Sequence, residues 1–149
     1  MKFEEEIKQS SFKNPKEKAI VNILYTGNWL RDRSEGLLKP KGINEQHFNI
    51  LRILRGRYPL TICPGEIKEV LINKRGDLTR LLDKLVTMGL VTRDVNPDNR
   101  RMINLKISDA GLNMLSDLDP KLEELNQKNN ALSHEESEQL SHLLDKMRG

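Results

Sequence analysis

Apolar and polar positions follow a helical period in one basic stretch of the chain. Four leucines recur at i, i+3, i+4 and i+7, a spacing that places them on one face of a predicted helix. These residues are Leu78, Leu81, Leu82 and Leu85. The remaining positions are mostly polar and occupy the other face. Gly89 is expected to end this helix, because glycine adopts the left-handed C-cap conformation at little cost.

A β-hairpin is predicted directly after this helix. Residues 91–95 alternate with period two, and Ile103, Leu105 and Ile107 repeat that alternation in a return strand. Between them, residues 96–99 read Asn-Pro-Asp-Asn, which is typical of a turn, since proline fixes φ and Asp and Asn bond their own backbone. A basic helix followed by a hairpin is the order of a winged helix-turn-helix.

Helical patterns also precede this region. Apolar residues recur at roughly helical spacing over residues 15–38, and Pro40 and Gly42 then break the pattern. Asn44 is expected to cap a second helix, which ends at residues 56–59.

A third helix and the basic helix are expected to form the helix-turn-helix pair. Residues 60–62 read as a short strand, and Pro64 stands where the third helix should start. Asn73 either caps or precedes the basic helix. The few residues between the two helices are typical of a helix-turn-helix.

Two further helices are predicted after the hairpin. Ser108 should cap a long helix, and Pro120 within it should bend it by removing a backbone donor. Ser133 and Glu136 have the spacing of a capping box that opens a last helix. That helix carries four apolar residues on one face, which need cover: Leu140, Leu143, Leu144 and Met147.

These elements predict one domain, mainly α with a small β-hairpin wing. The winged helix-turn-helix lobe is expected at about 44–107, with helices at about 15–38 and 108–149 on either side. The outer helices could fold back on their own core. We favour their pairing with a second copy as dimerisation helices, because exposed leucine faces are otherwise rare. Residues 1–14 are polar and are predicted to fray.

Positive charge is concentrated in the predicted helix and hairpin. The whole chain carries only +3, yet residues 73–106 hold eight Lys/Arg against four Asp/Glu, and residues 107–149 hold four against nine. A solvated amphipathic surface would explain part of this. The arginine pair Arg100–Arg101 at the turn tip is not needed for folding, so we favour double-stranded DNA as the partner. A winged-helix module that binds protein remains the alternative.

Other classes of function find little support in the sequence. No apolar run approaches the ~20 residues of a membrane span, and the first ten residues, MKFEEEIKQS, lack a signal-peptide core. The single cysteine, Cys63, fits a reducing cytoplasm. The three histidines have no metal-ligand spacing. We therefore expect a cytoplasmic protein that is not an enzyme and has no metal and no cofactor.

Three motifs resemble the multiple-antibiotic-resistance regulator (MarR) family of bacterial transcription factors. They are LTRLLDKLVTMGLVTR at 78–93, PDNRR at 97–101 and ISDAG at 107–111. The resemblance implies a triangular homodimer joined by the N- and C-terminal helices. It implies a recognition helix in the major groove and a wing arginine in the minor groove of a palindromic operator, typical of a repressor. Residues 73–77 depart from the family's common small-residue start of that helix.

The candidate site residues follow from these patterns. We expect recognition-helix contacts to DNA from Lys74, Arg75, Asp77, Thr79, Arg80 and Lys84. Wing contacts are expected from Asp98, Asn99, Arg100 and Arg101. Asn99 stands where many family members have aspartate, which leaves Asp98 as the carboxylate that braces the wing arginine. The family often binds a small aromatic or anionic effector, and its candidate lining here, unless these residues are core packing, is Tyr25, Trp29, His47 and Phe48.

Overall fold

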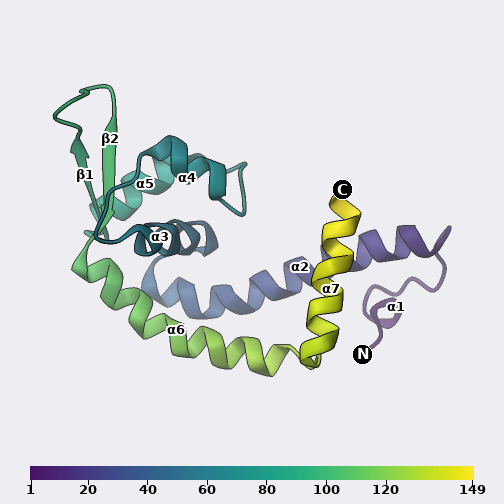
Figure 1. The fold of residues 1–149 in the computed structure, drawn as a ribbon. Helices are drawn as coiled ribbons and strands as arrows, with labels where there is room; N and C mark the ends of the chain where they lie inside the picture. The colour runs from purple at the N-terminus through teal and green to yellow at the C-terminus, as the bar shows by residue number, and fades with distance from the viewer.

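The computed structural model describes residues 1–149 as a winged helix-turn-helix carried by long helices (Figure 1). We call residues 45–107, which hold three helices and the hairpin, the head, and we call the long helices at 15–38, 109–129 and 134–148 the stalk. The fold class is confirmed as mainly helical with one two-stranded antiparallel hairpin. The elements are α1 (Phe3–Glu6), α2 (Pro15–Leu38), η1 (Lys39–Lys41), α3 (Glu45–Arg57), α4 (Pro64–Val70), α5 (Leu78–Thr87), β1 (Val91–Val95), β2 (Ile103–Ile107), α6 (Asp109–Asn129) and α7 (His134–Arg148).

The predicted helix starts are confirmed by their capping contacts. Asn44 Oδ1 accepts the His47 N–H at 3.0 Å, and Ser108 Oγ accepts the Gly111 N–H at 3.1 Å. Ser133 forms the predicted capping box at the start of α7. These side chains satisfy backbone donors that the first turn of a helix leaves without partners. Gly89 follows α5 with φ +74°, the left-handed conformation expected of it.

The core lies in the head and at its junction with the stalk. Ile50, Leu51 and Leu54 of α3 are fully buried and belong to the same apolar cluster as Leu115 and Leu118 of α6. Burying such side chains contributes roughly 1.5–3 kcal/mol each. The first half of α6 is therefore attached to the head by apolar packing.

The hairpin pairs as the period-two pattern predicts. Val91 lies opposite Ile107, and Val95 lies opposite Ile103. Leu105 and Ile107 are buried, whereas most of β1 is exposed. The base of the wing is thus part of the core, and its tip projects into solvent (Figure 1).

Two predictions for short segments are wrong. Residues 1–14 do not simply fray, because α1 forms and Phe3 stacks on Phe12 with 5.8 Å between ring centroids. Residues 60–62 do not form a strand. Only Ile62 pairs, through a single bridge to Leu105, because prolines at 59 and 64 lack the backbone donor that a longer strand needs.

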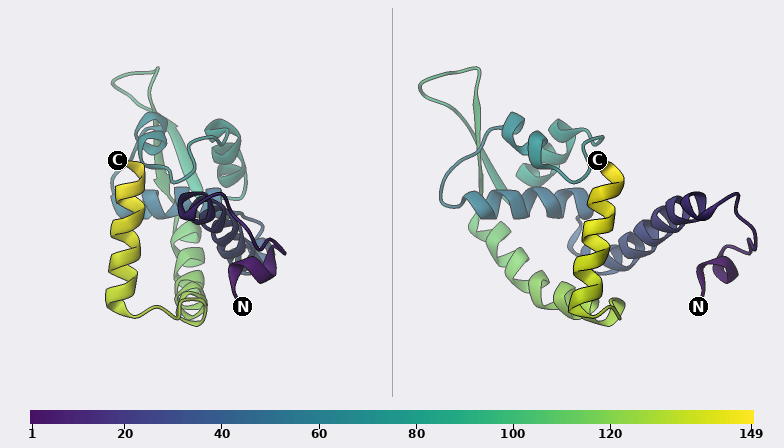
Figure 2. Two further views of the ribbon diagram at one scale, coloured as in Figure 1. Left: turned by 90° about the vertical axis from the view of Figure 1, so that its right-hand side faces the viewer. Right: turned by 45° about the vertical axis from the view of Figure 1, so that its right-hand side comes forward.

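The C-terminal helix stands apart from the rest of the chain. α6 runs through Pro120 without ending and follows a curved path (Figure 1). In the left view of Figure 2, α7 stands clear of α2 and α6, and none of its residues is buried. No helix is long and apolar enough to cross a lipid bilayer.

Candidate nucleic-acid interface

Helix α5 presents a polar face to solvent and an apolar face to the core. Leu82 and Leu85 are buried. Thr79, Arg80 and Lys84 are exposed on the other side. A helix held in this way offers one accessible surface, of the kind that enters a DNA groove in helix-turn-helix proteins.

The predicted extent of the basic helix needs correction at its N-terminal end. Lys74 and Arg75 lie in the turn before α5, and Asp77 is its N-cap. Asn73 Oδ1 accepts the Arg75 N–H at 3.1 Å, and Asp77 Oδ1 accepts the Arg80 N–H at 3.2 Å. Both bonds favour a turn over a helix here. Asp77 therefore caps the helix, whereas Lys74 and Arg75 are exposed at its tip.

Helix α3 holds the turn that leads into α5. Asn49 Oδ1 accepts the Ile72 N–H at 3.0 Å. Gly76 packs under Gln46 so closely that a Cβ there would lie 2.6 Å from Gln46 Nε2. These α3 residues were not among the predicted site residues, since nothing in their spacing relates them to the turn.

The wing tip is braced by asparagine side chains. Asn96 Oδ1 accepts the Asp98 N–H at 2.9 Å, and Asn99 Oδ1 accepts the Arg101 N–H at 3.1 Å. Asp98 makes no ion pair with Arg100 or Arg101, so the expected brace by Asp98 is wrong. The side-chain oxygens of Asn96 and Asn99, and not the Asp98 carboxylate, fix the backbone of the turn. Both guanidinium groups are exposed and without a partner in the chain.

An ion pair joins the wing to the recognition helix. Arg93 Nη1 on β1 lies 2.6 Å from Asp83 Oδ1 on α5. Arg93 was not among the predicted site residues. A signal for it existed, because the two residues flank the Gly89 turn and carry opposite charges.

A cleft of about 1130 Å³ lies between α2, α3 and α6. Of the four residues predicted to line an effector pocket, only Phe48 borders it. Tyr25 instead donates a hydrogen bond to Glu6, and Trp29 lies under the Arg33 guanidinium at 4.4 Å. These two rings therefore do not line the cleft, and the effector lining stays a prediction.

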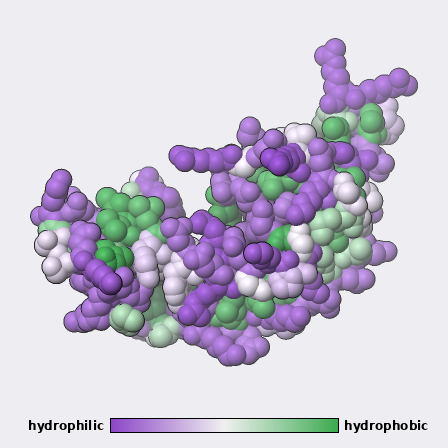
Figure 3. Space-filling model, turned by 180° about the vertical axis from the view of Figure 1, so that it is seen from behind, coloured by the Kyte–Doolittle hydropathy of each residue, from purple (hydrophilic) through white to green (hydrophobic).

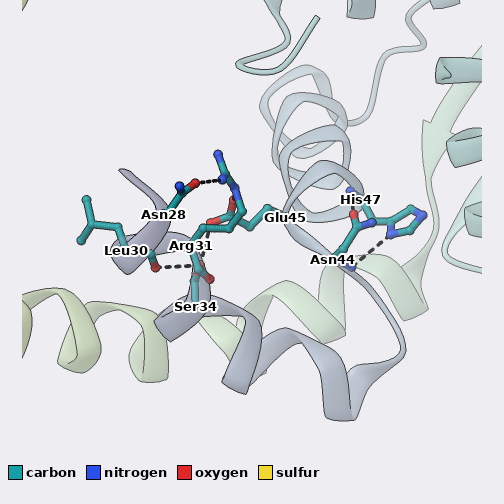
Figure 4. A network of polar contacts seen from close by, with 7 residues as sticks. All are labelled: Asn28, Leu30, Arg31, Ser34, Asn44, Glu45 and His47. Carbon is teal, nitrogen blue, oxygen red and sulfur yellow. Dashed lines mark hydrogen bonds and ion pairs between the residues drawn. The ribbon is translucent and has the colours of Figure 1, made fainter. Parts of the chain in front are cut away.

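His47 is a structural residue of α3. Its side chain is buried, and its Nδ1 accepts the Asn44 N–H at 3.0 Å (Figure 4). Burial lowers the pKa of His47, and the positive charge of Lys84 on α5 lowers it further. A neutral imidazole suits this position, because protonation would turn the acceptor Nδ1 into a donor facing a donor.

The stalk carries unpartnered apolar side chains. On α7, Leu140, Leu143 and Met147 are 45–54% exposed, and Leu144 is half-buried. On α2, Ile20, Ile23, Leu24 and Leu30 are also exposed. Figure 3 shows an apolar patch on the end of the molecule that carries α1 and the start of α2, away from the wing.

Groups that could support catalysis or metal binding do not converge. No cluster of three His, Cys, Asp or Glu side chains could hold a metal ion. Cys63 is half-buried at the start of α4, where its backbone N–H donates to Glu66 at 3.0 Å.

Comparison with known proteins identifies the family to which this chain is similar. Residues 43–103 match the model of the MarR family. The transcriptional repressor MprA of Escherichia coli (strain K12) is 31% identical over 119 residues, which cover 79% of this chain and 68% of that protein. The multiple antibiotic resistance protein MarR of the same strain is 33% identical over 93 residues, 62% of this chain and 63% of that protein.

A solved structure extends the similarity to almost the whole chain. A crystal structure of a mutant of MarR from E. coli, complexed with operator DNA, superposes with a TM-score of 0.74 and 28% sequence identity. The match covers 93% of this chain and 99% of that one.

Proposed function

This chain belongs to the MarR family of DNA-binding transcriptional regulators, and we propose that it acts as a homodimeric repressor on a palindromic operator. Members of this family regulate transcription and are not enzymes. The repressor role is supported by the similarity to MprA, which is named a transcriptional repressor. A regulator of this kind works on the bacterial chromosome, in the cytoplasm.

The observation that carries the proposal is the set of unpartnered basic side chains on the head. Arg100 and Arg101 project from the wing tip, and Arg80 and Lys84 flank the exposed Thr79 of α5. Folding does not account for these positions, because none of the four charges is buried. α5 enters the major groove, and the wing arginines follow the narrower minor groove, where negative potential is strongest.

A second copy covers the apolar face of the stalk. The residues predicted for the interface, Leu140, Leu143, Leu144 and Met147, lie on α7, in which no residue is buried. Two-fold pairing of the stalks buries this face and presents two heads to one face of the duplex. The operator is then an imperfect palindrome with half-site centres about 10 base pairs apart, or a multiple of that.

The cleft is the place for an effector that releases the protein from DNA. It is bordered by the Phe48 ring, over which the Arg52 guanidinium lies at 5.8 Å, and by three arginines and four carboxylates in all, a lining that suits a small aromatic effector with polar groups. The cleft also borders Ile72 and Leu81, on the turn and on α5. A ligand that binds in the cleft stabilises the position of the head in which the cleft is large enough to hold the ligand.

A salt titration on duplex DNA tests the proposal. The wild-type protein should bind labelled duplex with an affinity that falls steeply with salt, because phosphate contacts release counterions. Replacing both Arg100 and Arg101 with Ala should reduce the slope by about one counterion per lost phosphate contact and weaken binding by roughly 1–3 kcal/mol.

The controls separate DNA binding from a protein-binding role. Arg57→Ala removes an exposed arginine that pairs with Glu66 within the head, at 3.9 Å, and should leave the salt slope unchanged. Binding that ignores salt, or a double wing variant that binds as tightly as wild type, would favour the winged-helix adaptor that binds protein.

A further inference from the structure

Polar anchors at the two ends of α3 join the head to the stalk. At the first end, Glu45 accepts hydrogen bonds from two residues of α2, Ser34 Oγ at 2.6 Å and Arg31 Nε at 3.2 Å (Figure 4). At the other end, Arg55 Nη1 and Nη2 reach the two carboxylate oxygens of Asp119 on α6, at 2.6 and 3.4 Å. The helix is therefore fixed to a different stalk helix at each end.

The middle of α3 is not fixed in the same way. Phe48, Asn49 and Arg52 border the cleft that separates this face of α3 from α2 and from the second half of α6. Apolar packing holds α6 to the head at Leu115, Leu118 and Leu122, and Leu38 joins the end of α2 to the same cluster. On the side of the cleft, the two polar anchors supply the hydrogen bonds between α3 and the stalk.

The position of α3 determines the position of the recognition helix. Ile50, Leu51 and Leu54 pack in the core with Leu82 and Leu85 of α5. The turn before α5 is bonded to Asn49. A rotation of α3 against the stalk therefore carries α5 with it.

We infer that Glu45 and Arg55 are positioning residues that fix the angle between head and stalk and thereby determine which half-site spacing the protein accepts. The inference rests on the proposed homodimer. In a two-fold dimer, the distance between the two α5 helices depends on this angle in both protomers. The duplex presents equivalent groove faces only about every 10–10.5 base pairs. If the angle between head and stalk is less firmly fixed, the protein therefore discriminates less between half-site spacings.

Loss of one anchor should leave the fold intact. The side chains of Arg55 and Asp119 are 34% and 46% exposed, and partly exposed ion pairs contribute little to folding. In a dimer, this small contribution of the ion pair helps to fix the angle between head and stalk in both protomers. We expect the preference for the native spacing to fall by about twofold to thirtyfold in Arg55→Ala, the range set by such pairs acting twice.

The test uses a duplex that the wild-type protein selects from random-sequence DNA. The dissociation constant is measured on this duplex and on versions with one base pair inserted or removed between the half-sites. The ratio of the constants is compared among wild type, Arg55→Ala, Glu45→Ala and the charge swap in which Arg55→Asp is combined with Asp119→Arg. Arg57→Ala is the matched control, since its ion pair lies within the head and is similarly exposed.

A distance measurement gives a second readout that does not need DNA. Cys63 is the only cysteine and lies on the head, so one spin label per protomer reports the distance between the two heads. The distance distribution should broaden in Arg55→Ala and Glu45→Ala and stay narrow in Arg57→Ala. A purely structural role for the anchors would lower the melting temperature without broadening the distribution.

The outcomes distinguish the inference from the function on which it rests. A lower spacing ratio in Arg55→Ala that the charge swap restores supports the inference. An unchanged ratio together with an unchanged distance distribution overturns it and leaves the homodimeric regulator in place. A wild-type protein that is monomeric, or that selects no two-part site, overturns both.

Discussion

Replacing Gly111 with Ala should destabilise the protein, although alanine favours helices. Gly111 lies in the first turn of α6, beneath the base of the wing. A Cβ there would lie 2.6 Å from Ile107 Cγ1 and closer still to the Leu90 carbonyl oxygen. That oxygen already accepts the Ser108 N–H at 3.0 Å, so it has little freedom to move.

The magnitude follows from two opposing terms. Overpacking of this kind costs typically 1–3 kcal/mol, and a backbone atom as the nearest neighbour favours the upper half of that range. Against this loss, alanine stabilises a helix by up to about 1 kcal/mol relative to glycine. We expect a net loss of about 2 kcal/mol, which lowers the melting temperature of a chain of this length by roughly 4–8 °C.

Thermal and urea unfolding at one protein concentration provide the assay, because the stability of an oligomer depends on concentration. Gly56→Ala is the matched control. Gly56 lies in α3 with no atom within 4 Å of the added Cβ, so the change should be neutral or stabilising. If Gly111→Ala is as stable as wild type, α6 is not seated on Leu90 as closely as the structure places it.

Three further predictions concern the stalk, the recognition helix and pH. Charged substitutions at Leu140 and Leu144 should shift the mass measured by light scattering from dimer to monomer and weaken DNA binding; a dimer that persists would place the interface elsewhere. Thr79→Ala should change which operator variants bind, because Thr79 lies near the centre of the exposed face of α5, whereas Arg80→Ala should weaken all duplexes about equally and lower the salt slope by roughly one counterion. Because the pKa of His47 is lowered from 6.5 in the folded state, only the unfolded chain gains this proton just below that pH, so the free energy of unfolding should fall as the pH drops below about 6.5. Urea midpoints between pH 7.5 and 5.5 should show this fall in wild type and a smaller one in His47→Gln.

Local chemistry explains which elements could be predicted. Asn44 and Ser108 cap helices through bonds to residues three positions away, and Gly89 ends one through its own conformation. Each signal lies within a few residues of the boundary it determines. The sequence therefore predicts the starts of α3 and α6 and the end of α5 without knowledge of the rest of the fold.

The start of α5 was predicted too early because two local signals compete there. Lys74 and Arg75 are good helix formers, and they extend the basic pattern toward the third helix. The side chains of Asn73 and Asp77 instead bond nearby backbone N–H groups and hold a turn. A capping interpretation of Asp77 would have given the observed boundary.

The cleft could not be predicted for a different reason. His47 stands three residues after a capping Asn44, a position where its ring can accept the cap's own N–H, and in the structure it does so instead of lining the cleft. The cleft itself depends on contacts between distant segments. Arg55 and Asp119 are 64 positions apart, and neither lies in a motif that relates one to the other.

The fold places the positive and the negative segments of the chain on different elements. Residues 73–106, with an excess of four positive charges, form the turn, α5 and the wing, whereas residues 107–149, with an excess of five negative charges, form α6 and α7. A helix of the length of α6, 21 residues, spans about 30 Å. The negative charges near the far end of α6 are thus more than two screening lengths from the wing, since that length is about 8 Å at physiological ionic strength. They therefore leave the attraction of the head for phosphate largely intact, and they repel a duplex that approaches that end of α6. In the proposed complex, this separation of charge favours the approach that brings α5 and the wing to the grooves.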